Sequence, residues 1–125
     1  MPGGECLICK VIGYCEIHHI ILRSQASYMK NIKVNLVQLC MDHHRGSSNG
    51  VHHNKKLDLK LKVHLQNKLM DMFSVKQFYS IEEIQTILKC STDDVAKICK
   101  KLTCYSKGYL VSQIIIRLMG GRLYQ

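Results

Sequence analysis

A chain of 125 residues has room for one ordinary domain, or for two very small ones that need extra stabilisation. Its 18 Lys and Arg outnumber its 9 Asp and Glu in both halves of the chain, which favours a polyanionic partner: nucleic acid is the usual one, and an anionic membrane surface is the weaker alternative. No apolar run is long enough to span a bilayer, and residues 1–5 lack the basic start and apolar core of a signal peptide, so we expect a cytoplasmic protein with no membrane partner.

The first half of the chain predicts short strands. Apolar, β-branched stretches fit strands, polar stretches fit the loops between them, and a run of Gly, Ser and Asn interrupts a helix. We predict a zinc-knuckle turn over residues 1–10, one or two short strands over 11–22 and the loop of a long hairpin over 23–33. A further strand is predicted over 34–39, followed by the start of a helix at 41–45 and its interruption at 46–50.

A long helix is predicted next. Apolar residues interleaved with lysines over residues 54–73 fit one continuous helix. The alternation of apolar and polar residues at 57–65 also resembles a strand, which is the alternative. Residues 75–80 are predicted to be a linker.

The last third predicts a helix-turn-helix. Ser80 and Glu83 have capping-box spacing for a first helix, and Thr92 is a candidate cap for a second helix over residues 93–102. A further helix is predicted over residues 109–119. The second helix carries three lysines that we expect to contact DNA: Lys97, Lys100 and Lys101. The alternative is that these helices form only a small bundle or a dimer surface.

The seven cysteines favour metal ligation. The number is odd, and a reducing compartment disfavours disulfides. One C-x2-C pair and one C-x2-H pair have the spacing of two half-sites for tetrahedral zinc, with four predicted ligands: Cys6, Cys9, Cys40 and His43. The alternative is that the first pair is incidental. The remaining cysteines are expected to be small buried apolar residues: Cys15, Cys90, Cys99 and Cys104.

The histidines predict a second metal site. Six of the seven lie between positions 18 and 53, and neutral imidazole is both a common metal ligand and a general base near neutral pH. Consecutive side chains on a strand point to opposite faces, so His18 and His19 cannot do the same job. One can bind a metal while the other acts as a base on water. His44 can project from the start of a helix toward that strand, and His64 is expected to be a solvated surface residue.

With Asn35 standing between these histidine pairs, residues 5 to about 73 resemble an HNH nuclease of the ββα-metal class. The resemblance implies that His19 is the general base that activates the attacking water and that Asn35 ties the hairpin loop and holds this base in place. It also implies that His18 and His44 ligate the catalytic cation. Many members carry a structural zinc held by two C-x2-C-like pairs, and the predicted zinc set matches that feature. The run from His43 through Lys55 is similar to small HNH proteins encoded by bacteriophages of Gram-positive bacteria.

The chain departs from this family plan at Ser48, where some members place another histidine one helical turn after the last. His52 or His53 would replace that ligand across the Gly-rich insertion, and we prefer His52. If neither reaches the metal, the site has two histidine ligands. The candidate catalytic cations are Mg, Mn, Ni and Zn, and a histidine-rich site suits the last three better than Mg.

We therefore expect an α+β architecture. Residues 1–75 would form a zinc-stapled ββα-metal core, and residues 76–125 a small helical domain with a helix-turn-helix. The expected function is a metal-dependent DNA endonuclease that hydrolyses phosphodiester bonds, encoded by a phage or prophage and acting in the cytoplasm of the bacterial host. The alternative is a non-catalytic zinc-stabilised DNA-binding protein, or a recombination accessory protein that binds branched or single-stranded DNA.

Overall fold

The computed structural model describes residues 4–125, so positions 1–3 of the predicted knuckle turn lie outside the described residues. The described chain combines small antiparallel sheets with α-helices, which agrees with a mixed α and β architecture. None of the described helices has both the length and the apolar character that a bilayer span needs.

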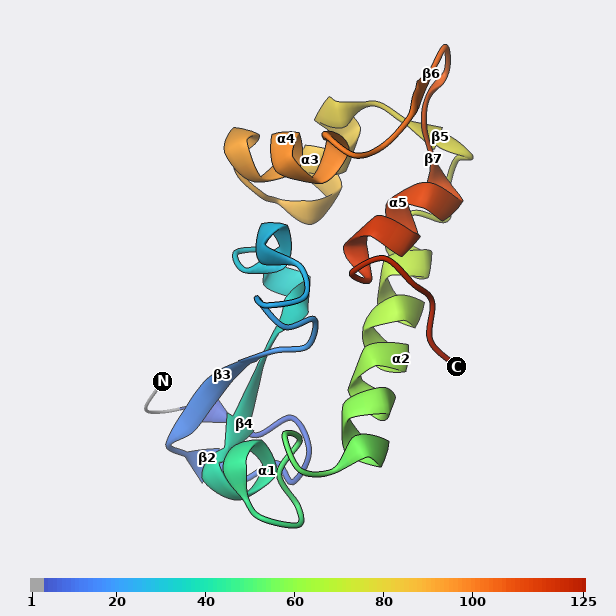
Figure 1. Cartoon of the computed structure of the whole chain (residues 1–125). Coiled ribbons are helices and arrows are strands. Elements are labelled where there is room, and N and C mark those ends of the chain that lie inside the picture. Colours follow the sequence, from blue (N-terminus) through green and yellow to red (C-terminus); the bar gives the residue numbers. More distant parts are fainter. Residues whose placement is uncertain (1–3) are drawn as a thin grey trace.

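The first half contains the predicted hairpin followed by a short helix (Figure 1). The main strand pair is in antiparallel register, with Cys15 opposite Cys40 and His19 opposite Leu36. Two short 3-10 turns occupy the hairpin loop. The elements are β1 (Gly4–Glu5), β2 (Ile12–Gly13), β3 (Cys15–His19), η1 (Ser27–Met29), η2 (Lys33–Asn35), β4 (Leu36–Cys40) and α1 (Met41–Arg45).

The second half has more strand than the sequence predicts. Its elements are α2 (Lys55–Met72), β5 (Phe78–Tyr79), α3 (Ile81–Leu88), α4 (Thr92–Cys99), β6 (Cys104–Tyr105), β7 (Gly108–Leu110) and α5 (Val111–Leu118). A three-stranded sheet in the order β5–β7–β6 links them. The predicted linker thus contains a strand, and the last helix begins at Val111 because the three residues before it pair in the sheet.

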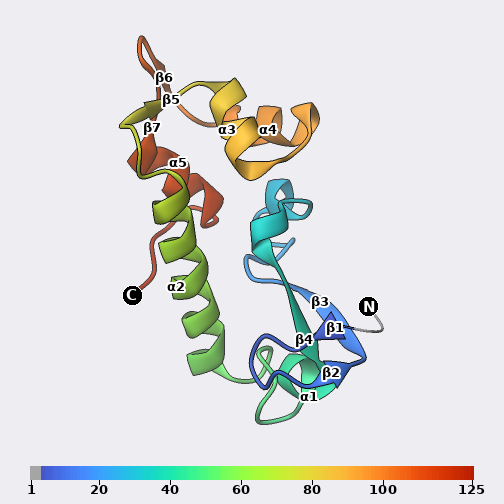
Figure 2. The ribbon, with the colours of Figure 1, turned by 180° about the vertical axis from the view of Figure 1, so that it is seen from behind.

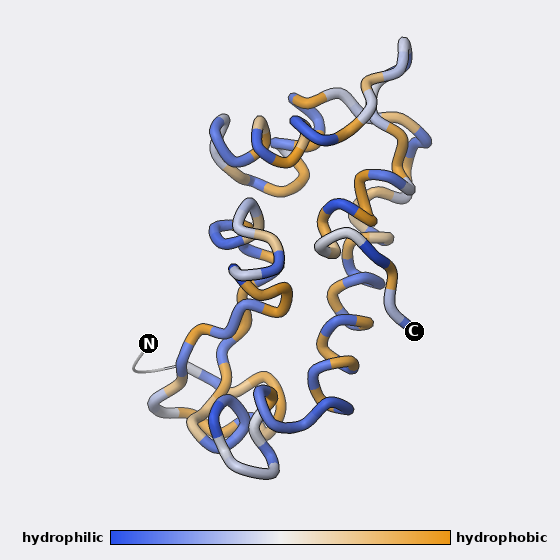
Figure 3. Tube along the Cα trace, viewed as in Figure 1, coloured by the Kyte–Doolittle hydropathy of each residue, from blue (hydrophilic) through white to orange (hydrophobic). Residues whose placement is uncertain are grey.

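The long helix α2 forms despite its strand-like alternation. Its buried leucines Leu61, Leu65 and Leu69 are spaced four residues apart and therefore lie on one helix face. Asn54 caps the helix, since its Oδ1 accepts a hydrogen bond from the Leu57 N–H at 3.1 Å. Figure 3 shows apolar and polar residues alternating around the turns of this helix.

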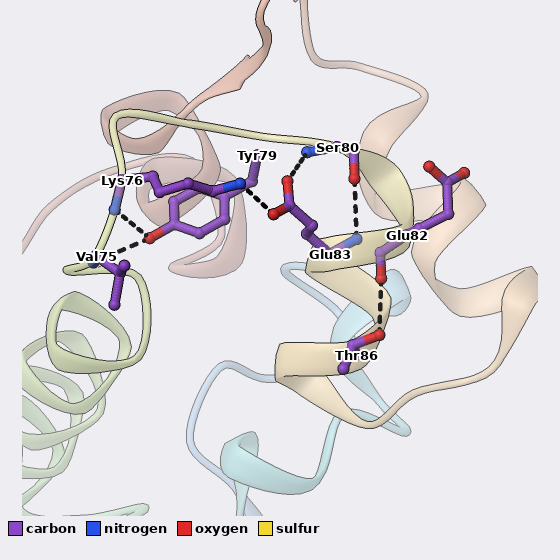
Figure 4. Close-up of polar contacts among 7 residues, drawn as sticks. All are labelled: Val75, Lys76, Tyr79, Ser80, Glu82, Glu83 and Thr86. Atoms are coloured by element: carbon purple, nitrogen blue, oxygen red, sulfur yellow. Dashed lines mark hydrogen bonds and ion pairs between the residues drawn. The ribbon is translucent and has the colours of Figure 1, made fainter.

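Two N-caps stabilise the helix pair α3 and α4. At α3 the predicted capping box is present: the Glu83 N–H donates to Ser80 Oγ at 3.1 Å, and the Ser80 N–H donates to Glu83 Oε1 at 2.9 Å (Figure 4). Lys76 also pairs with Glu83. At α4 the cap is Ser91 rather than Thr92, because Ser91 Oγ accepts from the Asp94 N–H.

The two halves pack on each other. The β3–β4 hairpin and α2 run side by side, α5 lies against α2, and α4 lies over η1 (Figures 1 and 2). Tyr28 Oη donates to the Arg117 carbonyl at 2.6 Å, and the Arg117 guanidinium lies 3.5 Å from the centre of the Tyr28 ring. One hydrophobic cluster includes core residues from both halves, and the division at residue 75 stays a prediction.

Candidate metal centres

The structure brings the four predicted zinc ligands together. Cys9 Sγ lies 3.8 Å from Cys40 Sγ, and His43 Nδ1 lies 3.9 Å from Cys6 Sγ and 3.3 Å from Cys40 Sγ. Zinc–sulfur bonds of ~2.3 Å and zinc–nitrogen bonds of ~2.0 Å in a tetrahedron place two sulfurs ~3.8 Å apart and sulfur and nitrogen ~3.5 Å apart. The donor set and its spacing therefore fit one tetrahedral zinc.

Backbone turns position the knuckle that carries Cys6 and Cys9. The Lys10 N–H donates to the Cys6 carbonyl at 2.9 Å, and Lys10 has a positive φ of 65°. The Leu7 N–H donates to the Gln38 carbonyl at 2.9 Å, which ties the knuckle to β4. Cys40 ends β4 and precedes α1, so the second ligand pair follows directly from the hairpin.

The environment of Cys6 favours its thiolate. Burial opposes the charged form, but backbone N–H groups of Cys9, Cys40 and Ile8 donate to its sulfur, and the net effect lowers the pKa of Cys6 to about 6. Because zinc binds thiolate and not thiol, this lowered pKa favours metal binding near neutral pH.

The other cysteines differ from one another. Cys15 and Cys99 are buried and Cys90 is partly buried, in line with a packing role. Burial raises the pKa of Cys99 to about 11, which keeps this thiol neutral. The prediction is wrong for Cys104, which is exposed, because it lies on the β6–β7 hairpin away from the core.

Three histidines converge at the second centre. His18 comes from β3, His44 from α1, and His52 from the loop before α2. One ring nitrogen from each lies within 4.8 Å of the others, and the Nε2 atoms of His44 and His52 are 3.1 Å apart. His53, the alternative third ligand, is exposed and lies outside this cluster, and His64 is exposed as predicted.

A cation would satisfy this arrangement better than the protein does alone. His18 is 2 % exposed, and its Nε2 is buried without a hydrogen-bond partner in the described chain. Buried polar atoms are rarely left in that state. Burial, helped by the nearby His44 and His52, lowers the pKa of His18 to about 3, so its ring is neutral and offers a lone pair. The three histidines therefore fit a divalent metal with room for further ligands.

Glu16 contacts the second candidate centre, and the sequence analysis missed it. Its Oε1 lies 2.7 Å from His44 Nδ1 and 2.7 Å from Arg45 Nε. Hydrogen bonds from these two groups lower the pKa of Glu16 to about 2, and His44 makes the larger contribution. The carboxylate thus accepts a hydrogen bond from the His44 Nδ1–H, which leaves the Nε2 lone pair to face a metal. A signal was available, since Glu16 stands two residues before His18 and shares its strand face.

A tight loop returns His52 to the cluster. The Gly50 N–H donates to the Gly46 carbonyl at 3.0 Å, and the Val51 N–H donates to the His43 carbonyl at 2.8 Å. A Cβ on Gly50 would lie 2.5 Å from the Gly46 backbone, so only glycine fits there. The Gly-rich insertion therefore closes on α1 and brings the next histidine back to His44.

His19 lies apart from the three-histidine cluster. Its Nε2 is 3.0 Å from the Lys30 carbonyl oxygen, which only accepts hydrogen bonds, so Nε2 carries the proton and Nδ1 is the basic nitrogen. Asn35 is fully buried and holds the same loop: its Nδ2 donates to the carbonyls of Ile21 and Met29, and its Oδ1 accepts from the Ile21 N–H at 2.7 Å.

A cavity of ≈170 Å³ opens beside His18 and His52. Lys55, Asp58 and Lys62 line it, and Lys62 Nζ pairs with Asp58 Oδ2 at 2.9 Å. A small anion that enters this cavity would meet both lysine charges beside the candidate metal site.

The three predicted DNA-binding lysines are all exposed but do not share one site. Lys97 and Lys100 line a hollow formed with the η1 loop, whereas Lys101 lines a different hollow beside α5.

Comparisons with known proteins add no assignment. No family model, curated protein or solved structure matches the chain.

Proposed function

We propose that the protein is a metal-dependent DNA endonuclease that hydrolyses phosphodiester bonds, of the HNH type and of phage or prophage origin. The observation that carries the proposal is the convergence of His18, His44 and His52 around the unpartnered Nε2 of His18. The net charge of +9 supports a polyanionic substrate.

In this proposal His19 is the general base. The Lys30 backbone carbonyl accepts the hydrogen bond of the Nε2–H, which leaves Nδ1 as the nitrogen that takes a proton from water. Asn35 is a positioning residue, because it fixes the loop from which the Lys30 carbonyl comes. The two lysines of the cavity hold the phosphate by charge and read no base sequence.

His18, His44 and His52 would hold the divalent ion, and Glu16 would orient His44. When bound, such an ion neutralises charge on the phosphate and stabilises the departing oxygen. Histidine ligands suit Zn, Ni or Mn, and Mg remains a candidate.

Plasmid nicking across a metal titration tests the proposal. We expect His19→Ala to lose on the order of a hundredfold to ten-thousandfold in rate while metal binding is retained, because it removes a base and no ligand. We expect His44→Ala to lower the affinity for the catalytic metal and to be partly rescued by excess metal.

His64→Ala is the matched control, because His64 is an exposed histidine outside both clusters. It should cleave like the wild type. If the wild type binds DNA but cleaves with none of the four metals, the alternative of a non-catalytic zinc-stabilised DNA-binding protein is supported instead.

A further inference from the structure

The region where the two halves of the chain meet contains a basic hollow of ≈300 Å³. One wall is the loop segment 25–28 with η1, and the other comes from α4 and α5. Three cationic side chains line it, namely Lys97, Lys100 and Arg117, and none of the described residues that line it is acidic.

One of the three positive charges in this hollow, that of Arg117, is fixed in position by its contacts. Arg117 Nε donates to the Ile98 carbonyl at 2.9 Å, and Nη2 donates to the Lys97 carbonyl at 2.8 Å. Its guanidinium also stacks on the Tyr28 ring, so this charge is fixed in the wall. The predicted second helix ends at Cys99, so Lys97 lies in the last turn of α4 and Lys100 is its C-cap residue. Lys100 keeps helical φ and ψ, so the two exposed lysines lie one turn apart on the same face.

The η1 loop also limits what α4 can do. A helix that reads base edges must enter the major groove, which is about 12 Å wide. The face of α4 that carries Lys97 is flanked by η1, which packs against α4 and forms the other wall of the hollow. Phosphate groups at the DNA surface can reach such a hollow without full insertion of the helix.

We infer that this hollow binds backbone phosphates of double-stranded DNA, using Lys97 and Lys100 with the fixed charge of Arg117, and that it does so without reading base sequence. The inference rests on DNA being the substrate, as proposed above. It replaces a base-reading role of α4 with a phosphate clamp built from both halves of the chain.

Fluorescence anisotropy with a short labelled duplex tests the clamp, using the full chain with no divalent metal added. A loss of nuclease chemistry does not affect this readout. We expect the double variant K97Q/K100Q to bind more weakly. Its plot of log affinity against log salt should also be less steep, by about two in slope, because two phosphate contacts are lost. K107Q, whose exposed lysine lies in the β6–β7 turn outside the hollow, should keep the wild-type slope.

A charge placed on the loop wall tests whether the N-terminal half takes part. Ser27→Glu puts a carboxylate into the hollow and should weaken binding, whereas Ser24→Glu makes the same charge change on the same loop outside the lining and should not. Unrelated duplexes should bind equally to within about threefold.

Three results would overturn the inference. One is a K97Q/K100Q variant with wild-type affinity and slope. Another is an equal loss in Ser24→Glu and Ser27→Glu, which would indicate unspecific charge repulsion. The third is a preference above about tenfold for one sequence selected from a random pool, which would indicate base reading by α4.

Discussion

At the residue scale, one carboxylate connects the strand and the helix that carry the histidine ligands. Glu16 on β3 accepts hydrogen bonds from His44 and Arg45 on α1, across 28 and 29 residues of sequence. A histidine ligand held in this way keeps one tautomer and one ring orientation. The orientation of His44 therefore depends on a carboxylate that is not itself part of the three-histidine cluster.

We expect Glu16→Gln to lower the affinity of the three-histidine centre for metal by about tenfold to a hundredfold, because the neutral amide orients His44 less strongly. The measurement is a cobalt(II) titration followed by visible absorption, with the structural site filled by zinc. Glu82→Gln, an exposed change on α3, is the control and should bind like the wild type. Equal cobalt(II) affinity in both variants would show that Glu16 only holds α1 against β3 and does not affect metal binding.

His18 predicts a pH dependence of stability. Burial lowers the pKa of His18 from 6.5 to about 3. Below pH 6.5 His18 therefore binds a proton in the unfolded chain but stays unprotonated in the folded protein. This contribution to stability is present above about pH 6.5 and is lost as the pH falls toward about 3. Between pH 6.5 and 5 the loss is at most about 2 kcal/mol.

Urea unfolding of the wild type and of His18→Gln at pH 7 and pH 5 checks this dependence. The variant should lose less stability between the two values, while the exposed control His53→Gln should follow the wild type. Parallel behaviour of His18→Gln and the wild type would contradict a buried neutral His18.

At the element scale, the predicted parts are those with local signals. The leucines of α2 are spaced for one helix face, and Ser80 and Glu83 are spaced for a capping box, so both helices could be predicted. The sheet β5–β7–β6 could not, because strands of two or three residues show no alternation and their partners are distant in sequence.

The same distinction applies to the metal centres. The spacing of Cys6, Cys9, Cys40 and His43 indicates a ligand set without knowledge of the fold. The choice of His52 over His53 needs the closed loop at Gly50, and the role of Glu16 needs the packing of α1 against β3. The strand spacing places Glu16 on the same face as His18, but its pairing with His44 and the return of His52 depend on contacts between distant segments.

The capping box of α3 predicts a measurable loss. Ser80→Ala should lower the free energy of unfolding by about 1 kcal/mol, because the Glu83 N–H loses its side-chain acceptor. Chemical denaturation measures the change, and Ser106→Ala in the exposed β6–β7 turn should cost less than about 0.5 kcal/mol. Equal losses would mean that the cap contributes nothing specific.

At the scale of the whole molecule, the four candidate Cys and His ligands bring together three segments of the N-terminal half. The knuckle, the β3–β4 hairpin and α1 meet at the four-ligand site, and α1 then supplies His44 to the second centre. Adjacent residues His43 and His44 thus belong to two different sites. Two metal ions per chain are expected.

The last prediction separates these two sites. Cys40→Ser removes one ligand of the proposed structural zinc, and structural zinc supplies on the order of 10 kcal/mol of folding free energy in zinc-finger peptides. That amount is comparable to the whole stability of a small domain, so Cys40→Ser should lose one equivalent of zinc and the cooperative melting of the N-terminal half. His44→Ala should keep that zinc and melt nearly like the wild type, since His43 belongs to the other site. Cys104→Ser, a change at an exposed cysteine, should alter neither metal content nor melting. Elemental analysis and thermal melts of the three variants decide the matter: a Cys40→Ser protein with full zinc content and an unchanged melting temperature would show that the four ligands hold no structural zinc.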